Sequence, residues 1–363
     1  MRVLCGRAAG NGAGSVSLAR IAVDAMGGDF APRAPIAGAV QALGALAPEH
    51  HIDLVGPTAV IEAELDVLLG GELAGLARVR ERLAIVDAPD VIAMTDKPSV
   101  ALRGKTNSSM VVGIKRVAEG HAHAFVSAGN TGAQMAASLV LLKLHPGLTR
   151  PAIGTIFPTA KEPILVLDVG ANVDCAAEEL VQFARIGTVY ARALLGRAEP
   201  AVGLLSIGEE PEKGNLAVKE AHQRLLGAGL NFLGNVEGRD LPRGVCDRGP
   251  IDVVVCDGFT GNILLKFYES IGPMLIGMVS QVAGLDARKV AGSLKQLDVD
   301  EYGGAPLLGV RGVSIISHGK SSPRAISNAI QVALRAYESG MTDEIGRRLA
   351  ESMPQASPSG TAS

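Results

Sequence analysis

Short apolar runs recur along this chain, with longer helical patterns between them. Most of the runs lack the alternation of polar and apolar residues that marks a half-exposed strand. Uninterrupted apolar runs are typical of strands that are buried on both faces of a mainly parallel sheet. We therefore predict strands at residues 21–26, 52–55, 83–86, 124–127, 153–157, 164–169, 202–207, 231–233, 252–256 and 313–317.

Several segments between these strands follow the three- and four-residue spacing of amphipathic helices. Residues 175–195 place Leu180 and Phe183 on one face, and residues 133–144 and 325–338 show the same pattern. An alternation of strands and helices predicts a layered α/β fold with right-handed crossover connections.

The chain shows no internal repeat and no long linker. We expect one interwoven α/β domain over residues 21–350, which could be bilobed. A Gly/Ala/Ser-rich flexible extension precedes it at residues 1–20, and a flexible tail follows at residues 351–363.

Residues 267–300 have a different pattern, because Met274 and Met278 lie on one apolar helical face. We predict a helical hairpin that kinks or restarts at Gly272-Pro273. The sequence leaves two functions open for it. The hairpin either packs on the core or on a partner subunit, or it presents a surface to a membrane or an acidic partner.

Composition excludes several classes of protein. Apolar residues make up 47% of the chain and charged residues 20%, so bulk disorder is excluded. The net charge of −3 and the 3% of aromatic residues argue against nucleic-acid binding. The four cysteines have no C-x-x-C spacing, and no apolar run reaches the roughly 18 residues of a membrane span. We expect a cytoplasmic protein with reduced thiols.

Six predicted strands run into turns that are rich in glycine and small polar residues. In a parallel sheet the carboxyl ends of the strands share one edge, where ligands bind. Glycines there let backbone N–H groups approach a ligand, and helix N-termini add positive potential. We expect one anion pocket built from residues 24–29, 127–132, 168–172, 206–215, 257–262 and 317–322.

The usual nucleotide and hydrolase motifs are missing from the sequence. It has no G-x-x-x-x-G-K-[ST], no G-x-G-x-x-G and no G-x-S-x-G. His121 and His123 could hold a metal, but they lack further ligands nearby, so we predict no metal site. With no evident covalent nucleophile, the pocket suits a reaction in which a bound anion is itself the nucleophile.

Long motifs in and around these turns carry a family resemblance. They are IAVDAMGGD (21–29), VSAGNTGA (126–133), LDVGAN (167–172), NFLGNVEGRD (231–240), DVVVCDGFTGN (252–262), YGGAPLLG (302–309) and HGKS (318–321). In this order they resemble the bacterial acyl-ACP:phosphate acyltransferases, the PlsX family, over about residues 21–340. The chain departs from the family pattern at Phe30, where His is usual, at Ser206, where Asn is usual, and in the extension at residues 1–20. Phe30 excludes a general base at that position.

The resemblance implies a fold, a reaction and partners. The fold would be a three-layer α/β/α structure with a largely parallel sheet, related to isocitrate dehydrogenases and phosphate acetyltransferases. A homodimer without a cofactor would convert long-chain acyl-ACP and inorganic phosphate into acyl phosphate and free acyl carrier protein (ACP). The acyl phosphate would feed a membrane glycerol-3-phosphate acyltransferase in phospholipid synthesis. Peripheral contact with the membrane or with that acyltransferase is a further expectation.

Matching positions supply candidate site residues. We expect Lys213 to contact phosphate or the oxyanion, and Asn262 to cap a helix, to donate a hydrogen bond to the substrate, or to do both. Asp257 could accept a proton from hydrogen phosphate or orient Lys213. Further candidates for binding substrate or phosphate are Asp24, Gly27, Gly28, Asp29, Ser127, Gly129, Asn130, Thr131, Gly132, Asp168, Asn172, Gly261, His318, Gly319 and Ser321.

Because acyl carrier proteins are acidic, basic residues are candidates for docking them, and the alternative for each is ordinary surface charge. These residues are Lys115, Arg116, Arg288, Lys289 and Lys295. Three other functions stay open: a small-acyl phosphotransacetylase that uses coenzyme A, a metal- and NAD-dependent decarboxylating dehydrogenase, and a non-enzymatic scaffold that binds ACP or tethers to a membrane.

Overall fold

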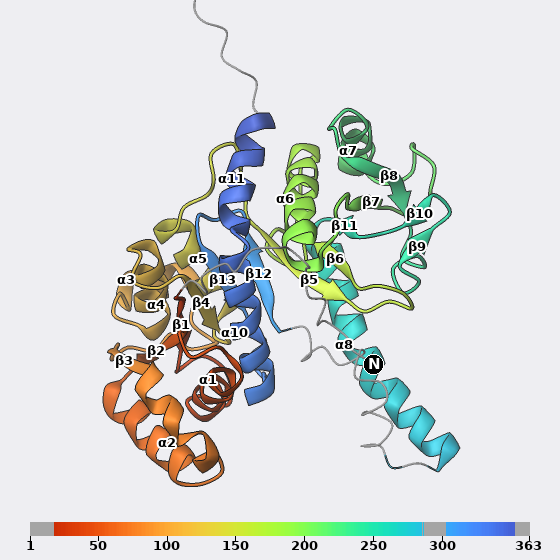
Figure 1. Cartoon of the computed structure of the whole chain (residues 1–363). Coiled ribbons are helices and arrows are strands. Elements are labelled where there is room, and N and C mark those ends of the chain that lie inside the picture. The colour runs from red at the N-terminus through yellow and green to blue at the C-terminus, as the bar shows by residue number, and fades with distance from the viewer. Residues whose placement is uncertain (1–17, 285, 287–302, 353–363) are drawn as a thin grey trace, which may run out of the picture.

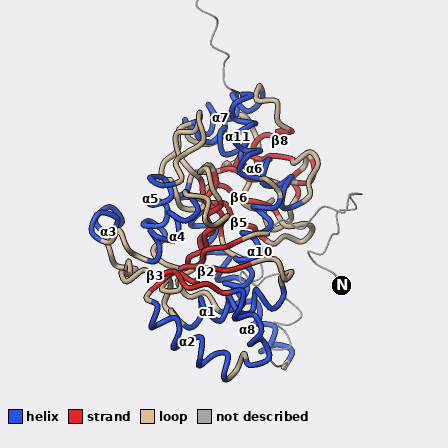
Figure 2. The backbone as a smooth tube through the Cα atoms, turned by 60° about the vertical axis from the view of Figure 1, so that its left-hand side comes forward, coloured by secondary structure: helices blue, strands red, loops and turns tan. Residues whose placement is uncertain are grey.

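An eleven-stranded sheet forms the centre of the computed structural model, which describes residues 18–284, 286 and 303–352. Its strands are β1 (Arg20–Asp24), β2 (His51–Gly56), β3 (Leu83–Asp87), β4 (Ala124–Ser127), β5 (Ala152–Phe157), β6 (Ile164–Leu167), β7 (Ala201–Leu205), β8 (Asn231–Val236), β11 (Val253–Val255), β12 (Ala305–Leu308) and β13 (Val313–Ile316). The spatial order is β3-β2-β1-β4-β13-β12-β5-β6-β11-β7-β8. Figure 2 shows these strands as a band through the middle of the molecule, with helices on both sides. All ten predicted strands are present, with ends shifted by a few residues.

The strands change direction at the centre of the sheet. β1, β2, β3, β4 and β13 are parallel to one another, and β6, β7, β8 and β11 are parallel to one another. Between these halves, β12 is antiparallel to both β13 and β5, so β5 keeps the direction of the first half. β6 is antiparallel to β5, and the second half therefore runs opposite to the first.

This reversal corrects the prediction that six polar turns share one edge of the sheet. The turns after β1, β4 and β13 leave from one edge, and the turns after β6, β7 and β11 leave from the opposite edge. A short antiparallel pair, β9 (Val245–Cys246) with β10 (Gly249–Pro250), lies outside the main sheet.

Helices cover both faces of the sheet. They are α1 (Arg33–Ala45), α2 (Thr58–Gly70), η1 (Ala74–Arg82, a 3₁₀-helix), α3 (Pro98–Gly104), α4 (Ser109–Ala118), α5 (Thr131–Leu141), α6 (Ala177–Leu195), α7 (Leu216–Leu226), α8 (Gly258–Ala283), α10 (Pro323–Glu338) and α11 (Met341–Ser352). Alternate residues of a strand enter different cores, as on β1, where Ile21 and Val23 join one core and Ala22 joins the other. The first core includes α1, α2, α6, α7, α10 and α11, and the second includes α3, α4, α5 and the start of α8. The predicted three-layer α/β/α architecture is confirmed.

α8 extends away from the body of the molecule. Its first turns pack Leu265 and Tyr268 on the second core, and Figure 1 shows its far part projecting beyond the rest of the fold. The helix continues through Pro273, so the predicted restart at this point does not occur. The second arm of the predicted hairpin falls on residues 285 and 287–302, outside the described residues, as do residues 1–17 and 353–363.

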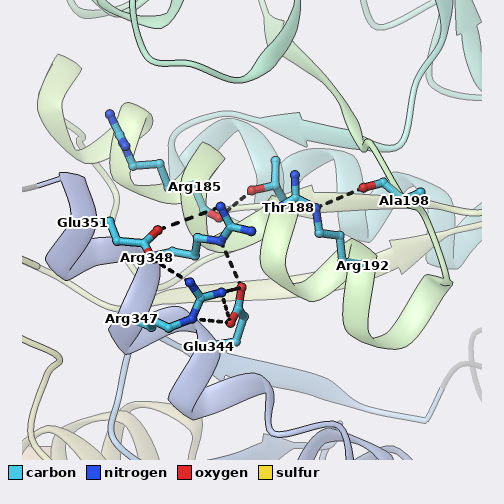
Figure 3. Close-up of polar contacts among 8 residues, drawn as sticks. All are labelled: Arg185, Thr188, Arg192, Ala198, Glu344, Arg347, Arg348 and Glu351. Carbon is cyan, nitrogen blue, oxygen red and sulfur yellow. Dashed lines mark hydrogen bonds and ion pairs between the residues drawn. The ribbon is translucent and has the colours of Figure 1, made fainter.

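α11 joins the two halves of the molecule. It follows α10, which packs on β4 and β13, and it lies beside α6 of the second half. Figure 3 shows Arg347 and Arg348 paired with Glu344 and Glu351 along α11, next to Arg192 of α6. These ion pairs are exposed and contribute little to stability. The buried residues Ile345 and Leu349, which join the first core, hold the helix in place.

Candidate active site

A cavity of about 180 Å³ lies over β5, between the two halves of the sheet. Ile153 and Thr155 of β5 line it. One side comes from α5 and from the segment between β13 and α10, and the other side comes from α8 and from the residues after β6. Its polar lining residues are Thr131, Thr155, Asn262, Lys266, Glu269, Ser317, His318 and Ser321. Turns from opposite edges of the sheet therefore meet at this cavity.

The turns of the first half pack against one another. Ser127 Oγ donates to Asp24 Oδ2 at 2.7 Å, and the backbone N–H of Gly129 donates to Ser127 Oγ at 3.0 Å. The backbone N–H of Asp29 donates to the Gly319 carbonyl at 2.7 Å. A Cβ on Gly27 would lie 2.8 Å from Asp24 Oδ2, so only glycine fits there. These residues form a supporting layer and do not line the cavity.

Asp24 is buried within this layer. Burial raises the pKa of its carboxyl group, and hydrogen bonds with Ser109 and Ser127 oppose the rise. A carboxyl group in these surroundings positions the loops around it, because its oxygens are already engaged by neighbouring donors.

Asn130 and Thr131 bring the N-terminus of α5 to the cavity. Asn130 is the N-cap: its side-chain oxygen accepts from the Ala133 N–H at 3.0 Å, and its amide donates to the carbonyl groups of Ala93, Met94 and Asp96. Thr131, the first residue of the helix, lines the cavity. The positive end of the helix dipole therefore lies at the wall of this cavity.

In the second half, Asp168 organises the loop that follows β6. One carboxylate oxygen accepts from the backbone N–H groups of Ile153, Gly170 and Ala171, and the other accepts from the N–H and the side-chain amide of Asn172. Burial raises the pKa of Asp168, and these hydrogen bonds lower it. The Asn172 side chain also donates to the Pro151 carbonyl at 2.8 Å. Both residues hold the loop, and neither lines the cavity.

Asn262 lines the cavity from the first turn of α8. Its side-chain amide donates to the Val169 carbonyl at 3.1 Å. Gly170 has a φ of +139°, and a Cβ there would come within 2.8 Å of the Asn262 amide nitrogen. Gly261 approaches the same loop more closely, since its Cβ would lie 1.8 Å from the Asp168 carbonyl oxygen. Because both positions are glycine, the start of α8 and the loop after β6 can approach each other closely, and this approach positions Asn262.

Asp257 and Lys213 lie elsewhere. Asp257 is the N-cap of α8, and its carboxylate accepts from the Thr260 N–H at 2.8 Å and from the Thr260 hydroxyl at 2.9 Å. It lines a second cavity of about 530 Å³, together with Cys175 and Asn215. Lys213 lies in the exposed segment before α7 and is not among the residues that line either cavity.

His318 follows β13 and reaches the cavity from its exposed rim. Its Nδ1 accepts from the Lys320 N–H at 3.1 Å. In the neutral ring the proton therefore lies on Nε2, which is left to donate to a ligand. Ser321, nine-tenths buried, lines the cavity beside it.

Sequence comparison identifies the family. Residues 19–344 match the sequence model of a family described as "Fatty acid synthesis protein". The phosphate acyltransferase of Moorella thermoacetica is 46% identical over 337 residues, which is 90% of this chain and 95% of that protein. The phosphate acyltransferase of Heliobacterium modesticaldum is 49% identical over 331 residues, 88% of this chain and 94% of that protein. This chain belongs to the PlsX family of phosphate acyltransferases.

Solved structures agree with the fold that the PlsX family resemblance implied. A phosphotransacetylase from Streptococcus pyogenes superposes with a TM-score of 0.59 at 17% identity, covering 88% of this chain and 94% of that one. The 4-hydroxythreonine-4-phosphate dehydrogenase from Klebsiella pneumoniae gives 0.51 at 13% identity, covering 89% and 99%. At these identities the likeness concerns the fold alone.

Residues that the sequence did not single out complete the cavity. Lys266 and Glu269 lie on α8, and Lys266 Nζ pairs with Glu269 Oε2 at 2.8 Å. In the sequence, a Lys and a Glu three positions apart within a long apolar stretch are the pattern that could have indicated these two residues. Thr155 and Ser317 also line the cavity, and Ser317 opens a polar turn that the sequence did indicate.

Two of the proposed ACP-docking residues have partners in the fold. Arg116 Nη2 pairs with the buried Asp53 carboxylate at 2.6 Å. The Arg116 side chain is therefore already engaged by an ion pair within the fold. Lys115 is exposed and lies 3.7 Å from Glu119. Arg288, Lys289 and Lys295 fall outside the described residues.

Proposed function

We propose that this chain transfers a long-chain acyl group from acyl-ACP to inorganic phosphate. A phosphate oxygen attacks the thioester carbonyl, the C–O bond forms, and the C–S bond of the tetrahedral intermediate breaks. The ACP thiolate takes up the proton of hydrogen phosphate, so that acyl phosphate and free ACP thiol leave. The observation that carries the proposal is the cavity between the sheet halves, where Asn262, His318 and the N-terminus of α5 converge in a member of the PlsX family.

Each group would have a distinct role in this reaction. The Asn262 amide and His318 Nε2–H are hydrogen-bond donors for phosphate or for the oxyanion of the intermediate. The N-terminus of α5 favours the charge of phosphate. A thiolate leaves readily, so a general acid is less necessary. Lys213 stays a prediction, because it does not line this cavity, and Asp257 already caps α8.

A comparison of substrates tests the proposal. The purified chain is incubated with phosphate and either palmitoyl-ACP or acetyl-CoA, and free thiol and acyl phosphate are measured. We expect turnover with palmitoyl-ACP and little with acetyl-CoA. A preference for acetyl-CoA would identify a small-acyl phosphotransacetylase, and no turnover with either would favour a scaffold that binds ACP.

We further propose a homodimer that buries the outer face of α8. Phe267, Met274 and Met278 are exposed there, and they fall on one side of the helix. In the described part of the chain, α8 is long and apolar enough by length and composition to cross a membrane, but such a helix is weak evidence for a span. Lys266 and Glu269 are its charged residues, whereas helices that lie on membranes carry many cations. A second copy of this apolar face is therefore the occupant that we favour.

A substitution on this face of α8 distinguishes a second copy of the chain from a membrane as its binding partner. Met278→Asp should shift the protein from dimer to monomer in light scattering, because a charge would be buried without a partner. Val67→Asp on α2 is the control, since Val67 is 60% exposed and Met278 56% exposed. A wild-type monomer that floats with lipid vesicles would instead support a cytoplasmic enzyme with peripheral membrane contact.

A further inference from the structure

Ser317 carries a buried hydroxyl group that finds no hydrogen-bond partner among the described residues. It follows the last residue of β13, is 4% exposed, and lines the cavity over β5. Its backbone N–H donates to the Ser127 carbonyl at 2.8 Å, so its position is fixed. Its Oγ, in contrast, is left without a hydrogen-bond partner within residues 18–284, 286 and 303–352. Leaving a buried hydroxyl unsatisfied costs about 1–3 kcal/mol, so a group of this kind calls for an explanation.

Gly304 packs closely beside this hydroxyl. Its φ is +77°, in the left-handed region that favours glycine. A Cβ at this position would lie 3.1 Å from Ser317 Oγ and 2.8 Å from Ile315 Cγ2. Gly304 also lines the cavity. A side chain at this point would therefore press against the Ser317 hydroxyl, and glycine avoids that contact.

The surroundings of the hydroxyl favour an anion. Thr131, at the N-terminus of α5, and His318, whose neutral ring carries its proton on Nε2, line the same cavity. The volume of about 180 Å³ exceeds the roughly 30 Å³ that one water occupies in the liquid, so the cavity can hold a larger group. A tetrahedral oxyanion accepts hydrogen bonds in several directions, which suits donors that approach from separate elements.

We propose that Ser317 is a phosphate-binding residue, whose hydroxyl donates a hydrogen bond to an oxygen of inorganic phosphate in this cavity. This inference rests on the proposed function, because phosphate is the nucleophile of that reaction. It assigns phosphate to the side of the cavity formed by β13 and α5, and it leaves the α8 side, with Asn262, to the thioester carbonyl.

Ser317→Ala tests the assignment by kinetics. Hydrogen bonds to charged groups are strong, so the KM for phosphate should rise about 10- to 100-fold, while the KM for acyl-ACP stays within about twofold. The melting temperature without phosphate should not fall, because the wild-type hydroxyl has no partner to lose. Ser314→Ala, on the strand that leads to Ser317, is the matched control. Its hydroxyl accepts from Gln134 and from Ser138, so this variant should melt earlier but keep the KM for phosphate.

A binding measurement keeps the test independent of turnover. Phosphate should raise the melting temperature of the wild type and of Ser314→Ala, and should raise that of Ser317→Ala much less. An equal shift in all three proteins, or no shift in the wild type, would overturn the inference. If phosphate shifts the wild type selectively but palmitoyl-ACP is not cleaved, the phosphate site stands and the proposed function fails.

Discussion

The positions of side chains that line the cavity depend on other residues that do not line it. Asn262 is held by the Val169 carbonyl, and the loop that contains Val169 is held by the five hydrogen bonds to the Asp168 carboxylate. Thr131 depends in the same way on the cap and the three carbonyl contacts of Asn130. Polar residues of the turns therefore divide into those that face a ligand and those that hold the turn.

Removal of the Asn262 side chain should impair the reaction more than the fold. Asn262→Ala should lower kcat by about 10²–10³, the usual loss for one donor to an oxyanion, and the protein should still fold. Asn231→Ala is the control, because Asn231 is exposed at the start of β8 and lies outside the cavity. Acyl-phosphate formation and thermal melting are measured for both. Near-wild-type kcat in Asn262→Ala would remove this residue from the site.

His145 should make the protein sensitive to mild acid. It is 7% exposed, and burial lowers the pKa of its ring, with Arg311 acting in the same direction and Asp343 opposing. The folded state therefore binds fewer protons than the unfolded state, so the free energy of unfolding falls as the pH drops below about 6.5. The pKa values of His51 and His123 are also lowered, so they add to the effect.

Urea unfolding between pH 7.5 and pH 5.5 measures this dependence. His145→Gln should show a smaller loss of stability on acidification than the wild type. His121→Gln should keep the wild-type dependence, because His121 is exposed. An identical pH dependence in His145→Gln and the wild type would show that His145 does not contribute.

The sequence predicted some of the residues that line the cavity but could not separate them from residues that only hold the turns. Glycine-rich polar turns indicated Thr131, Asn262, His318 and Ser321, all of which line the cavity. Composition alone could not separate them from Asp24 and Asp168, because a buried carboxylate that holds a loop and one that binds a ligand occupy the same kind of turn.

Among the elements, α8 connects the cavity to the outer surface of the molecule. Asn262 and Lys266 face the cavity, and Met274 and Met278 are exposed on the projecting part (Figure 1). Its first turn is placed by the close approach of Gly261 to the Asp168 carbonyl. The position of Asn262 therefore depends on one glycine contact between a helix and a loop.

Two glycines of α8 test this dependence. Gly261→Ala should lower the free energy of unfolding by about 3 kcal/mol or more and should also reduce activity, because the added methyl group would overlap the Asp168 backbone. Gly277→Ala on the same exposed helix meets nothing within 4 Å, so it should be neutral or stabilising by up to about 1 kcal/mol. Equal stabilities of the two variants in urea unfolding would contradict this packing.

β12 is the strand of the main sheet that the sequence did not predict, and the reason is physical. β12 (Ala305–Leu308) is short, contains Pro306 and follows two glycines, and both residue types normally weaken a strand prediction. The antiparallel turn from β5 to β6 was recognisable, since residues 158–163 are too few for a parallel crossover. Most of the ten short apolar runs were found because burial on both faces leaves few polar residues.

At the scale of the whole molecule, the reversal at β5 and β6 creates the site. A uniformly parallel sheet would have set all six polar turns along one edge. Here three turns leave each edge, and turns from both meet over the central strands. Apolar periodicity could predict the layers, because it reports burial, but it does not report strand direction. The place of the cavity could therefore not be predicted from apolar periodicity alone.

The central claim is that phosphate itself attacks the thioester. The most direct measurement uses radiolabelled inorganic phosphate and palmitoyl-ACP with the purified chain, and compares label in acyl phosphate with free ACP thiol. The account predicts one labelled acyl phosphate for each thiol released, and no thiol release when phosphate is omitted. Thiol release without phosphate, or release without label in the acyl product, would contradict it.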